Sequence, residues 1–292
     1  GRTFGRKQKG EDKFYLYTAM NKLYKALIYD NEVSLSVLET TDLVNDAIKI
    51  HNLDENSAKT LGGLLTAAAY MSGCLKSEKG AVSLTVKAGG DAGTVSVSGD
   101  INLHIRGYID GSCGGKLDGG YLTVIKDDGF FRPFTGACEL AGNDVSENLM
   151  QYFDKSEQVP TAVAIGVNIK DGKCTAAGGV VMQLLPGTKQ ENMDKAEERM
   201  QAFVNAADVV EEYGADGILS AFFEGIAERE HTYLLLPEYK CNCSRKKIEN
   251  VILSLGKQEA LKICEEEGKI SVHCHYCNTD YNFTRDDVLK LF

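Results

Sequence analysis

Cys241-Asn242-Cys243 and Cys274-His275-Tyr276-Cys277 are two short cysteine motifs near the end of this 292-residue chain. Four thiolates on two loops can form a tetrahedron around one Zn²⁺ and leave no position for water. Such a site is structural, and its binding energy is folding energy for the segment between the loops. We therefore predict that Cys241, Cys243, Cys274 and Cys277 hold one zinc ion per chain.

The same motifs bring sulfur atoms together in pairs. If an oxidant reaches them, each pair can become a disulfide, and the metal must then leave because thiolates are its ligands. The motifs therefore predict both a stabilising metal site and a redox switch. His273 and His275 flank Cys274, and imidazole is a competent zinc ligand, so they are candidate ligands or outer contacts of the sulfurs.

Other interpretations of the cysteines stay open at this point. They could be unrelated buried thiols, or the second motif could be the catalytic pair of a thiol-disulfide oxidoreductase, although such pairs lie at a strand-to-helix turn in a βαβ context. A nucleic-acid-binding zinc module is a further alternative, since Arg245, Lys246 and Lys247 follow the first motif. The acidic remainder and the lack of an aromatic stacking platform argue against it.

Composition bounds the class of protein. The chain is 43% hydrophobic and 25% charged, as expected for a soluble globular protein of roughly two domains. Its net charge of −10 argues against general binding to nucleic acid or anionic membranes. No apolar run approaches the roughly 18 residues that span a bilayer. Nine cysteines, five of them scattered singly, favour a reducing compartment, most simply the cytosol.

The larger part of the chain predicts an α+β domain. Residues 1–13 are polar and basic, and we set them apart as an expression remnant or the stub of a transit segment. Strands and helices without a βαβ rhythm then indicate an α+β core over residues 14–188. We expect strands within 23–38 around a turn at Asp30-Asn31, antiparallel strands over 81–127 with turns at 91–93 and 98–100, and a strand pair over 161–169 and 174–185. The expected helices cover 41–51, 57–75 and 144–153, and Thr41-Asp42 is the expected cap of the first one.

Residues 189–238 predict a helical linker. It carries an apolar stripe, interrupted at Gly214 and Gly217, that consists of Met193, Ala196, Met200, Phe203, Val204, Ala207 and Val210. Such a stripe packs on a neighbouring domain, and a linker of modest stability would stay docked only while the following domain is folded.

Residues 239–292 predict a small domain. Ser244 and Thr284 cap its first and last helices, Gly256 and Gly268 end its first and second helices, and a strand hairpin over 270–272 and 281–283 carries the second cysteine motif. About fifty residues bury too little surface to be robust alone, so a metal is physically expected.

No enzymatic arrangement is evident in the sequence. Gly111 to Lys116 is one residue short of a phosphate-binding loop and lacks its Ser or Thr. His51, His104 and His231 have no local Ser, Cys or carboxylate that would suggest a triad. We therefore predict no catalytic residue.

These residues resemble a known family, the redox-regulated 33-kilodalton heat-shock proteins, also called 33-kilodalton chaperonins. The resemblance extends from Leu23 to Phe292, and its most specific parts are 241–245 and 274–278. Supporting segments are Arg106-Gly107-Tyr108, 119–127, 152–161 and Gln183-Leu184-Leu185-Pro186-Gly187.

The resemblance implies a holdase chaperone, not an enzyme, with an α+β core, a helical linker and a zinc-binding redox domain. In this family the reduced, zinc-bound form is inactive. The resemblance implies that oxidation pairs Cys241 with Cys243 and Cys274 with Cys277, after which zinc leaves and the small domain and linker unfold. It further implies binding of unfolded client proteins, a homodimer when activated, and transfer of clients to ATP-dependent chaperones.

Overall fold

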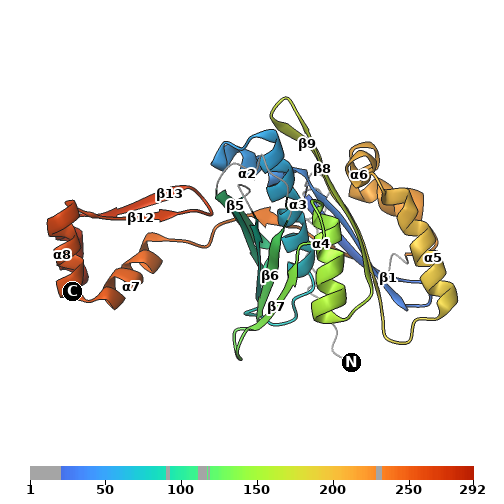
Figure 1. Ribbon diagram of the computed structural model, residues 1–292, viewed down its shortest axis with the longest axis horizontal. Helices are drawn as coiled ribbons and strands as arrows, with labels where there is room; N and C mark the ends of the chain where they lie inside the picture. The colour runs from blue at the N-terminus through green and yellow to red at the C-terminus, as the bar shows by residue number, and fades with distance from the viewer. Residues whose placement is uncertain (1–20, 90–92, 111–116, 118, 228–231) are drawn as a thin grey trace, which may run out of the picture.

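The computed structural model describes residues 21–89, 93–110, 117, 119–227 and 232–292. Most of them form a layered body of two largely antiparallel sheets with helices between and beside them (Figure 1). The last part of the chain forms a smaller unit at one side of this body. The predicted α+β fold class is confirmed. Within the described ranges, no helix has both the length and the apolar character needed to cross a bilayer.

The first sheet has the strand order β10-β1-β2-β9-β8. The predicted hairpin is confirmed, with its turn at Tyr29, Asp30 and Asn31, which all adopt left-handed backbone angles (φ 51°, 59° and 63°). Asp and Asn tolerate this conformation better than most residues. The strands are β1 Asn21–Ile28, β2 Val33–Thr40, β8 Thr161–Lys170, β9 Lys173–Leu184 and β10 Tyr233–Leu235.

The second sheet has the order β11-β5-β4-β3-β6-β7. The antiparallel strands expected between residues 81 and 127 are confirmed, and a short parallel strand from far along the chain is added at the β5 edge. The strands are β3 Ala81–Ala88, β4 Thr94–Asp100, β5 His104–Asp110, β6 Gly120–Asp127, β7 Phe134–Glu139 and β11 Glu238–Tyr239.

The turn predicted at residues 98–100 is wrong. These residues end strand β4, where Gly99 pairs with Val82. A Cβ at Gly99 would lie 2.1 Å from the Ser72 hydroxyl oxygen, so glycine is required here for close packing against a helix and not for a turn. The turn predicted at residues 91–93 lies largely outside the described residues.

Helix α3, Glu55–Ser72, lies between the two sheets and is almost entirely buried. The Asp54 carboxylate caps it by accepting from the Ser57 N–H at 3.0 Å, so the helix starts earlier than predicted, and it ends before residue 75. Its Gly62 and Gly63 leave room for the side chains of Val44 and Val145, which lie 3.0 Å from where a Cβ would be. Together with both sheets, α3 forms the inner core, which includes Leu23, Leu38, Leu61, Leu65, Val97 and Leu122.

Two shorter helices flank α3. Helix α2, Thr41–His51, begins after Thr40, whose hydroxyl bonds to that of Thr66 and does not cap the helix. The Thr41 hydroxyl lies inside the first turn and accepts from the Ala177 N–H, so the predicted Thr41-Asp42 cap is wrong. Helix α4, Val145–Tyr152, is capped by Asp144 and continues into the π-helical turn η2, Phe153–Glu157.

The linker helices cover the outer face of the first sheet (Figure 1). They are α5 Gln190–Met200, η3 Gln201–Phe203 and α6 Ala206–Phe223. With the sheet they form the outer core, which includes Ile28, Val37, Val180, Ala196, Phe203, Val210, Ile218 and Phe223. The predicted stripe is correct at Ala196, Phe203 and Val210, but Val204 is wrong, since it is 82% exposed in the turn between η3 and α6. Gly214, at φ 58°, interrupts α6 as expected.

The C-terminal unit has the elements that the sequence predicts. They are α7 Arg245–Leu255, α8 Lys257–Glu267, β12 Ile270–Cys274, β13 Thr279–Phe283 and α9 Arg285–Leu291. Ser244 and Thr284 cap α7 and α9 through their side chains. The unit's own buried cluster is small, comprising Ile252, Ala260, Cys264, Ile270, Phe283 and Val288. A core of this size provides little stability by itself.

Candidate metal centre

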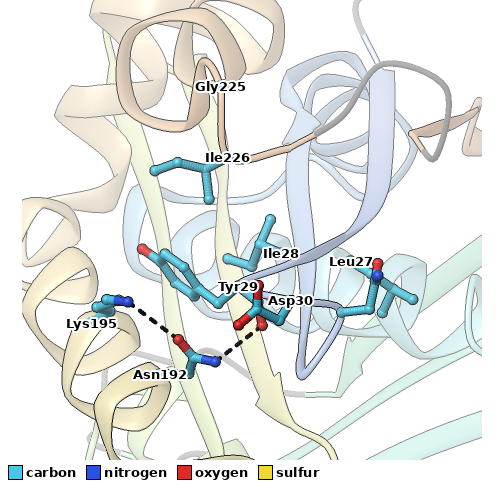
Figure 2. Close-up of a pocket in the computed structure, with 9 residues that line it drawn as sticks. Leu27, Ile28, Tyr29, Asp30, Asn192, Lys195, Gly225 and Ile226 are labelled. Atoms are coloured by element: carbon cyan, nitrogen blue, oxygen red, sulfur yellow. Dashed lines mark hydrogen bonds between the residues drawn. The ribbon is translucent and has the colours of Figure 1, made fainter.

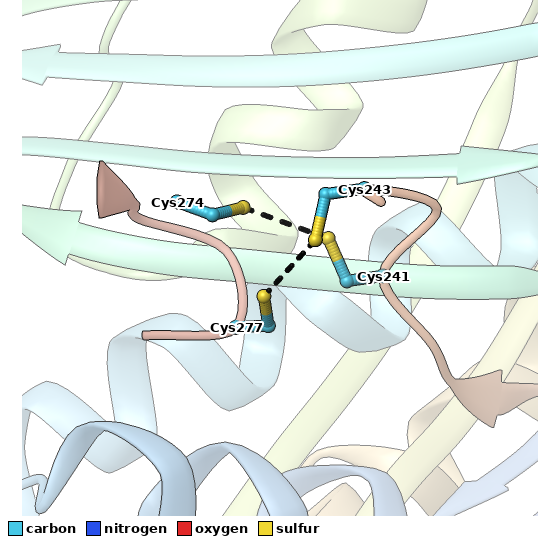
Figure 3. Close-up of side chains that lie close together, drawn as sticks. All are labelled: Cys241, Cys243, Cys274 and Cys277. Atoms are coloured by element: carbon cyan, nitrogen blue, oxygen red, sulfur yellow. Dashed lines mark hydrogen bonds between the residues drawn. The ribbon is translucent and has the colours of Figure 1, made fainter. Parts of the chain in front are cut away.

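The four cysteines of the two motifs meet in space (Figure 3). Their sulfur atoms all lie within 4.8 Å of one another. Two contacts between the motifs measure 3.7 Å from Cys241 to Cys274 and 3.3 Å from Cys243 to Cys277. Zn–S bonds of about 2.3 Å in a tetrahedron place the sulfurs about 3.8 Å apart, so this donor set has the spacing and chemistry for one Zn²⁺.

The local backbone explains how each sulfur reaches the cluster. Cys241 and Cys243 lie on extended chain between strand β11 and the N-terminus of α7. Cys274 is the last residue of β12, and the Cys277 N–H donates to the Cys274 carbonyl at 3.3 Å in the turn that leads to β13. Asn278 completes this turn in a left-handed conformation with φ 54°. Two short loops from distant parts of the sequence thus face each other.

The sulfurs have unequal acidities. Burial raises the pKa of the Cys241 and Cys277 thiols. Burial also acts to raise that of Cys243, but hydrogen bonds from the Tyr281 hydroxyl and from neighbouring thiols outweigh it and lower the pKa of Cys243 to about 7. A metal ion that binds here must displace the protons that the Cys241 and Cys277 thiols hold, so its affinity rises with pH and its binding releases protons.

The flanking histidines are not among the clustered donors. The His273 Nδ1 lies 2.7 Å from the Asp280 carboxylate. The His275 ring packs against Tyr108, with 5.2 Å between ring centroids. The first histidine holds the hairpin together, and the second contacts the α+β body.

Tyr239 connects the cysteine loops to the body. Its hydroxyl lies 2.7 Å from the Tyr276 carbonyl oxygen, 2.8 Å from the Gly107 carbonyl oxygen and 3.1 Å from the His51 Nε2. Tyr276 packs edge-on against Tyr108, and the Asn278 amide donates to the Ile50 carbonyl at 3.1 Å. The second cysteine motif therefore rests on β5 and the end of α2. Sequence reasoning missed this role of Tyr239, and its position just before the first motif is the only signal that pointed to it.

A polar network attaches the linker to the first sheet. The Lys189 N–H and the Asn192 amide donate to the Glu32 carboxylate at 2.9 and 2.8 Å. Asp216 of α6 bonds to Lys22 and Tyr24 of β1. A cavity of about 390 Å³ lies between the β1–β2 turn, α5 and Ile226, as Figure 2 shows. The linker is therefore held by polar contacts at its ends as well as by the outer core.

Two of the remaining candidate residues, His104 and Cys264, lie in a surface ion-pair group and in a packed cluster respectively. The segment that resembles a phosphate-binding loop lies outside the described residues, as does His231. His104 lies within 3.4 Å of the Asp100 carboxylate and 3.0 Å of the Glu238 carboxylate at the surface. Cys264 is buried in the C-terminal cluster, as expected for a packing residue.

Comparisons with known proteins agree with this architecture. The sequence profile described as Hsp33 protein matches residues 21–284. The 33 kDa chaperonin of Clostridium perfringens strain SM101 is 35% identical over 93% of this chain and 91% of its own length. That of Bacillus cereus strain AH187 is 32% identical over 92% and 97%.

A solved structure gives the same result. The crystal structure of the 33 kDa chaperonin from Thermotoga maritima has a TM-score of 0.79 and 26% identity, and the match covers 93% of this chain and 97% of that one. These relatives are named as chaperonins and not as enzymes, in agreement with the predicted class. The profile match and the curated relatives together establish that this chain belongs to the Hsp33 family, as a chaperone of the Hsp33 type.

Proposed function

We propose that this chain is a redox-regulated holdase, inactive while Cys241, Cys243, Cys274 and Cys277 hold Zn²⁺ and active after these cysteines are oxidised. The observation that carries the proposal is the four-sulfur cluster on two loops of a unit with a small core. Bound zinc would cross-link the two loops and contribute roughly 10 kcal/mol or more to folding, comparable to the whole stability of a domain.

Oxidation removes the metal ligands. Two thiols give up two electrons and two protons to form a disulfide, while one hydrogen peroxide is reduced to two water molecules. Following the family resemblance, we propose that the disulfides are Cys241–Cys243 and Cys274–Cys277. The sulfurs are also close across the motifs, from Cys241 to Cys274 and from Cys243 to Cys277, so mass-spectrometric mapping of the disulfides distinguishes the two pairings.

Loss of the C-terminal unit would release the linker. The segment 232–240 connects the two, and it also supplies strands β10 and β11 to the body. Once the cysteine loops unfold, this segment loses its anchor, and α5 and α6 lose one of their attachments. The outer core would then become exposed, and an apolar surface of several hundred Å² is what a holdase needs to bind unfolding proteins.

The alternatives have less support in the geometry. Cys277 lies in a β-hairpin turn and not at a strand-to-helix turn, which disfavours a thioredoxin-like oxidoreductase. Arg245 is engaged by Asp287 and the Phe283 ring, and the Lys247 ammonium donates to the Asn242 carbonyl at 2.5 Å. These cations therefore serve the fold of the unit, which disfavours a nucleic-acid module.

We further propose, on the family resemblance, that the activated protein forms a homodimer, passes clients to ATP-dependent chaperones and acts in the cytoplasm. We also propose three domains: the core at 14–188, the helical linker at 189–238 and the zinc-binding domain at 239–292. The first residue of the third domain lies on strand β11, which pairs with the body.

The proposal is tested by zinc and free-thiol content, far-UV circular dichroism and suppression of aggregation of a thermally unfolding model client, before and after treatment with peroxide under mild heat. We expect release of one zinc per chain, loss of four free thiols and a gain of protection in the same samples. Equal protection by the zinc-loaded reduced protein would refute redox control. Insulin reduction with turnover would favour the oxidoreductase, and gel-shift binding with a steep salt dependence would favour the nucleic-acid module.

A further inference from the structure

The segment 232–240 covers an edge of each sheet. Its strand β10 pairs with β1, and its strand β11 pairs with β5, by only three and two residues respectively. Among the described strands, β11 is the only one that pairs with the outer edge of β5. Because β11 leads directly into Cys241, the cover of this edge depends on the same segment that carries the first cysteine motif.

The backbone groups at the outer edge of β5 form their hydrogen bonds with this segment. The Glu238 N–H donates to the Leu103 carbonyl at 3.0 Å, and the Lys240 N–H donates to the Ile105 carbonyl at 2.9 Å. The Tyr239 hydroxyl contacts both the N–H and the carbonyl of Gly107, at 3.4 and 2.8 Å. An uncovered edge of this kind is a template for another extended chain.

Side chains beside this edge are covered by the second cysteine motif. The Tyr276 ring lies over the Arg106 guanidinium, 5.4 Å from its central carbon, and against the Tyr108 ring. The Arg106 Nη1 is buried and has no hydrogen-bond partner among the described residues. Departure of the loop would therefore leave a cation and an aromatic ring next to a free strand edge.

We infer that release of the segment 232–240 opens the outer edge of β5 as a docking site for an extended segment of an unfolding client, which adds there as a strand. This inference rests on the proposed function and specifies where a client binds. Main-chain hydrogen bonds give such a site its affinity without demanding a sequence, as a holdase requires, and side-chain contacts select apolar residues. The resident segment Leu234-Leu235-Leu236-Pro237-Glu238-Tyr239 shows the preferred chemistry: apolar and aromatic side chains with a carboxylate, that of Glu238, which lies 3.0 Å from the His104 Nε2 of β5.

The test uses the full-length protein and a synthetic peptide with the sequence of residues 232–240, Thr-Tyr-Leu-Leu-Leu-Pro-Glu-Tyr-Lys. Two N-methylated versions are compared by calorimetry. One carries methyl groups on the nitrogens that correspond to Glu238 and Lys240, which face β5; the control carries one on the nitrogen that corresponds to Tyr239, for which no contact to β5 is seen. We expect the unmodified peptide to bind only the oxidised protein, the first version to bind at least about tenfold more weakly, and the control to bind like the unmodified peptide.

Hydrogen exchange locates the site independently. We expect the amides of β5 to lose protection on oxidation and to regain it with the peptide or with a model client, while the central strand β3 stays protected throughout. Equal binding of both N-methylated peptides, or no peptide binding at all by a protein that still protects clients, would overturn the inference and leave the proposed function intact. Concentration-dependent protection of β5 without peptide would assign the edge to a second copy of the chain and also overturn it. Absence of zinc release and of client protection would refute the proposed function itself.

Discussion

The hydroxyl group of Tyr239 lies 2.7 Å from the carbonyl oxygen of Tyr276. It thereby joins the residues that precede the first cysteine motif to the turn of the second. The same hydroxyl contacts Gly107 and His51 of the body, so one side chain connects the four-cysteine cluster with the α+β core. A tyrosine hydroxyl has a single proton, so it donates to one of the two carbonyls and accepts from the N–H groups around it.

We expect Tyr239→Phe to accelerate zinc transfer to a chelator several-fold. The ring keeps its place, but whichever of the Tyr276 and Gly107 carbonyls accepts from the hydroxyl loses its donor, and the Gly107 N–H loses its acceptor, at a cost of about 1–3 kcal/mol for buried groups left unsatisfied. Chelator kinetics with the reduced protein measure the effect. Tyr233→Phe is the matched control, because Tyr233 lies on the same segment and is 57% exposed. Unchanged kinetics in both variants would show that the hydroxyl does not support the metal loops.

Substitution of one candidate ligand should separate the C-terminal unit from the body. We expect Cys277→Ser to lose zinc and to unfold residues 239–292, while the inner core keeps its cooperative transition. Zinc content, circular dichroism and limited proteolysis report these changes. Cys74→Ser serves as the control, since Cys74 is exposed and remote from the cluster. A Cys277→Ser protein with full zinc affinity would exclude Cys277 from the ligand set.

The linker can be displaced without touching the cysteines. Gly166 of β8 faces α6 so closely that an added Cβ would lie 2.5 Å from the Ala207 backbone nitrogen. We expect Gly166→Val to weaken linker docking by about 1–3 kcal/mol through overpacking. Binding of a hydrophobic dye and client protection should rise in the reduced protein, with zinc content unchanged. Lys170→Val places the same side chain at the exposed end of β8 and should have little effect; a similar response from it would argue against a docking effect.

Linker docking should weaken in acid. Hydrogen bonds from the Lys189 N–H and from the Asn192 amide lower the pKa of Glu32 below its ordinary value of 4.5. A carboxylate whose pKa is lowered in the docked state contributes docking free energy above that ordinary value, and this contribution is lost as the pH falls through the lowered pKa. We therefore expect hydrogen exchange of α5 to increase on acidification below about pH 4.5.

The variant Glu32→Gln isolates this contribution. It should show weaker docking at neutral pH and a smaller change on acidification. Burial raises the pKa of Glu39, which acts in the opposite direction, but Glu39 is present in both proteins and cancels in the comparison. Glu191→Gln is the control, because the ion pair that Glu191 forms in the described part of the chain is with Lys195 of its own helix. If Glu32→Gln kept the full acid response, another group would be responsible.

Local features of the fold could be predicted from the sequence. Ser244 and Thr284 cap their helices as expected, because a cap depends on residues three positions apart. The β1–β2 hairpin could also be predicted, because its turn depends on neighbouring residues. The prediction failed at Gly99, where the need for a glycine arises from Ser72 in another element. Val204 also fits the apolar period, but it lies in the turn between η3 and α6, where helical spacing no longer applies.

In the candidate site, too, some features follow from the sequence and others only from the tertiary structure. The spacing of Cys241, Cys243, Cys274 and Cys277 by itself determined a four-sulfur donor set, because ligands within each motif are fixed by a few backbone bonds. Only the tertiary structure decided that Tyr239 joins both motifs to β5, and that β10 and β11 cover the edges of two sheets. The contacts with β1 and β5 connect residues more than a hundred positions apart, and their register depends on how whole sheets pack and not on any local pattern.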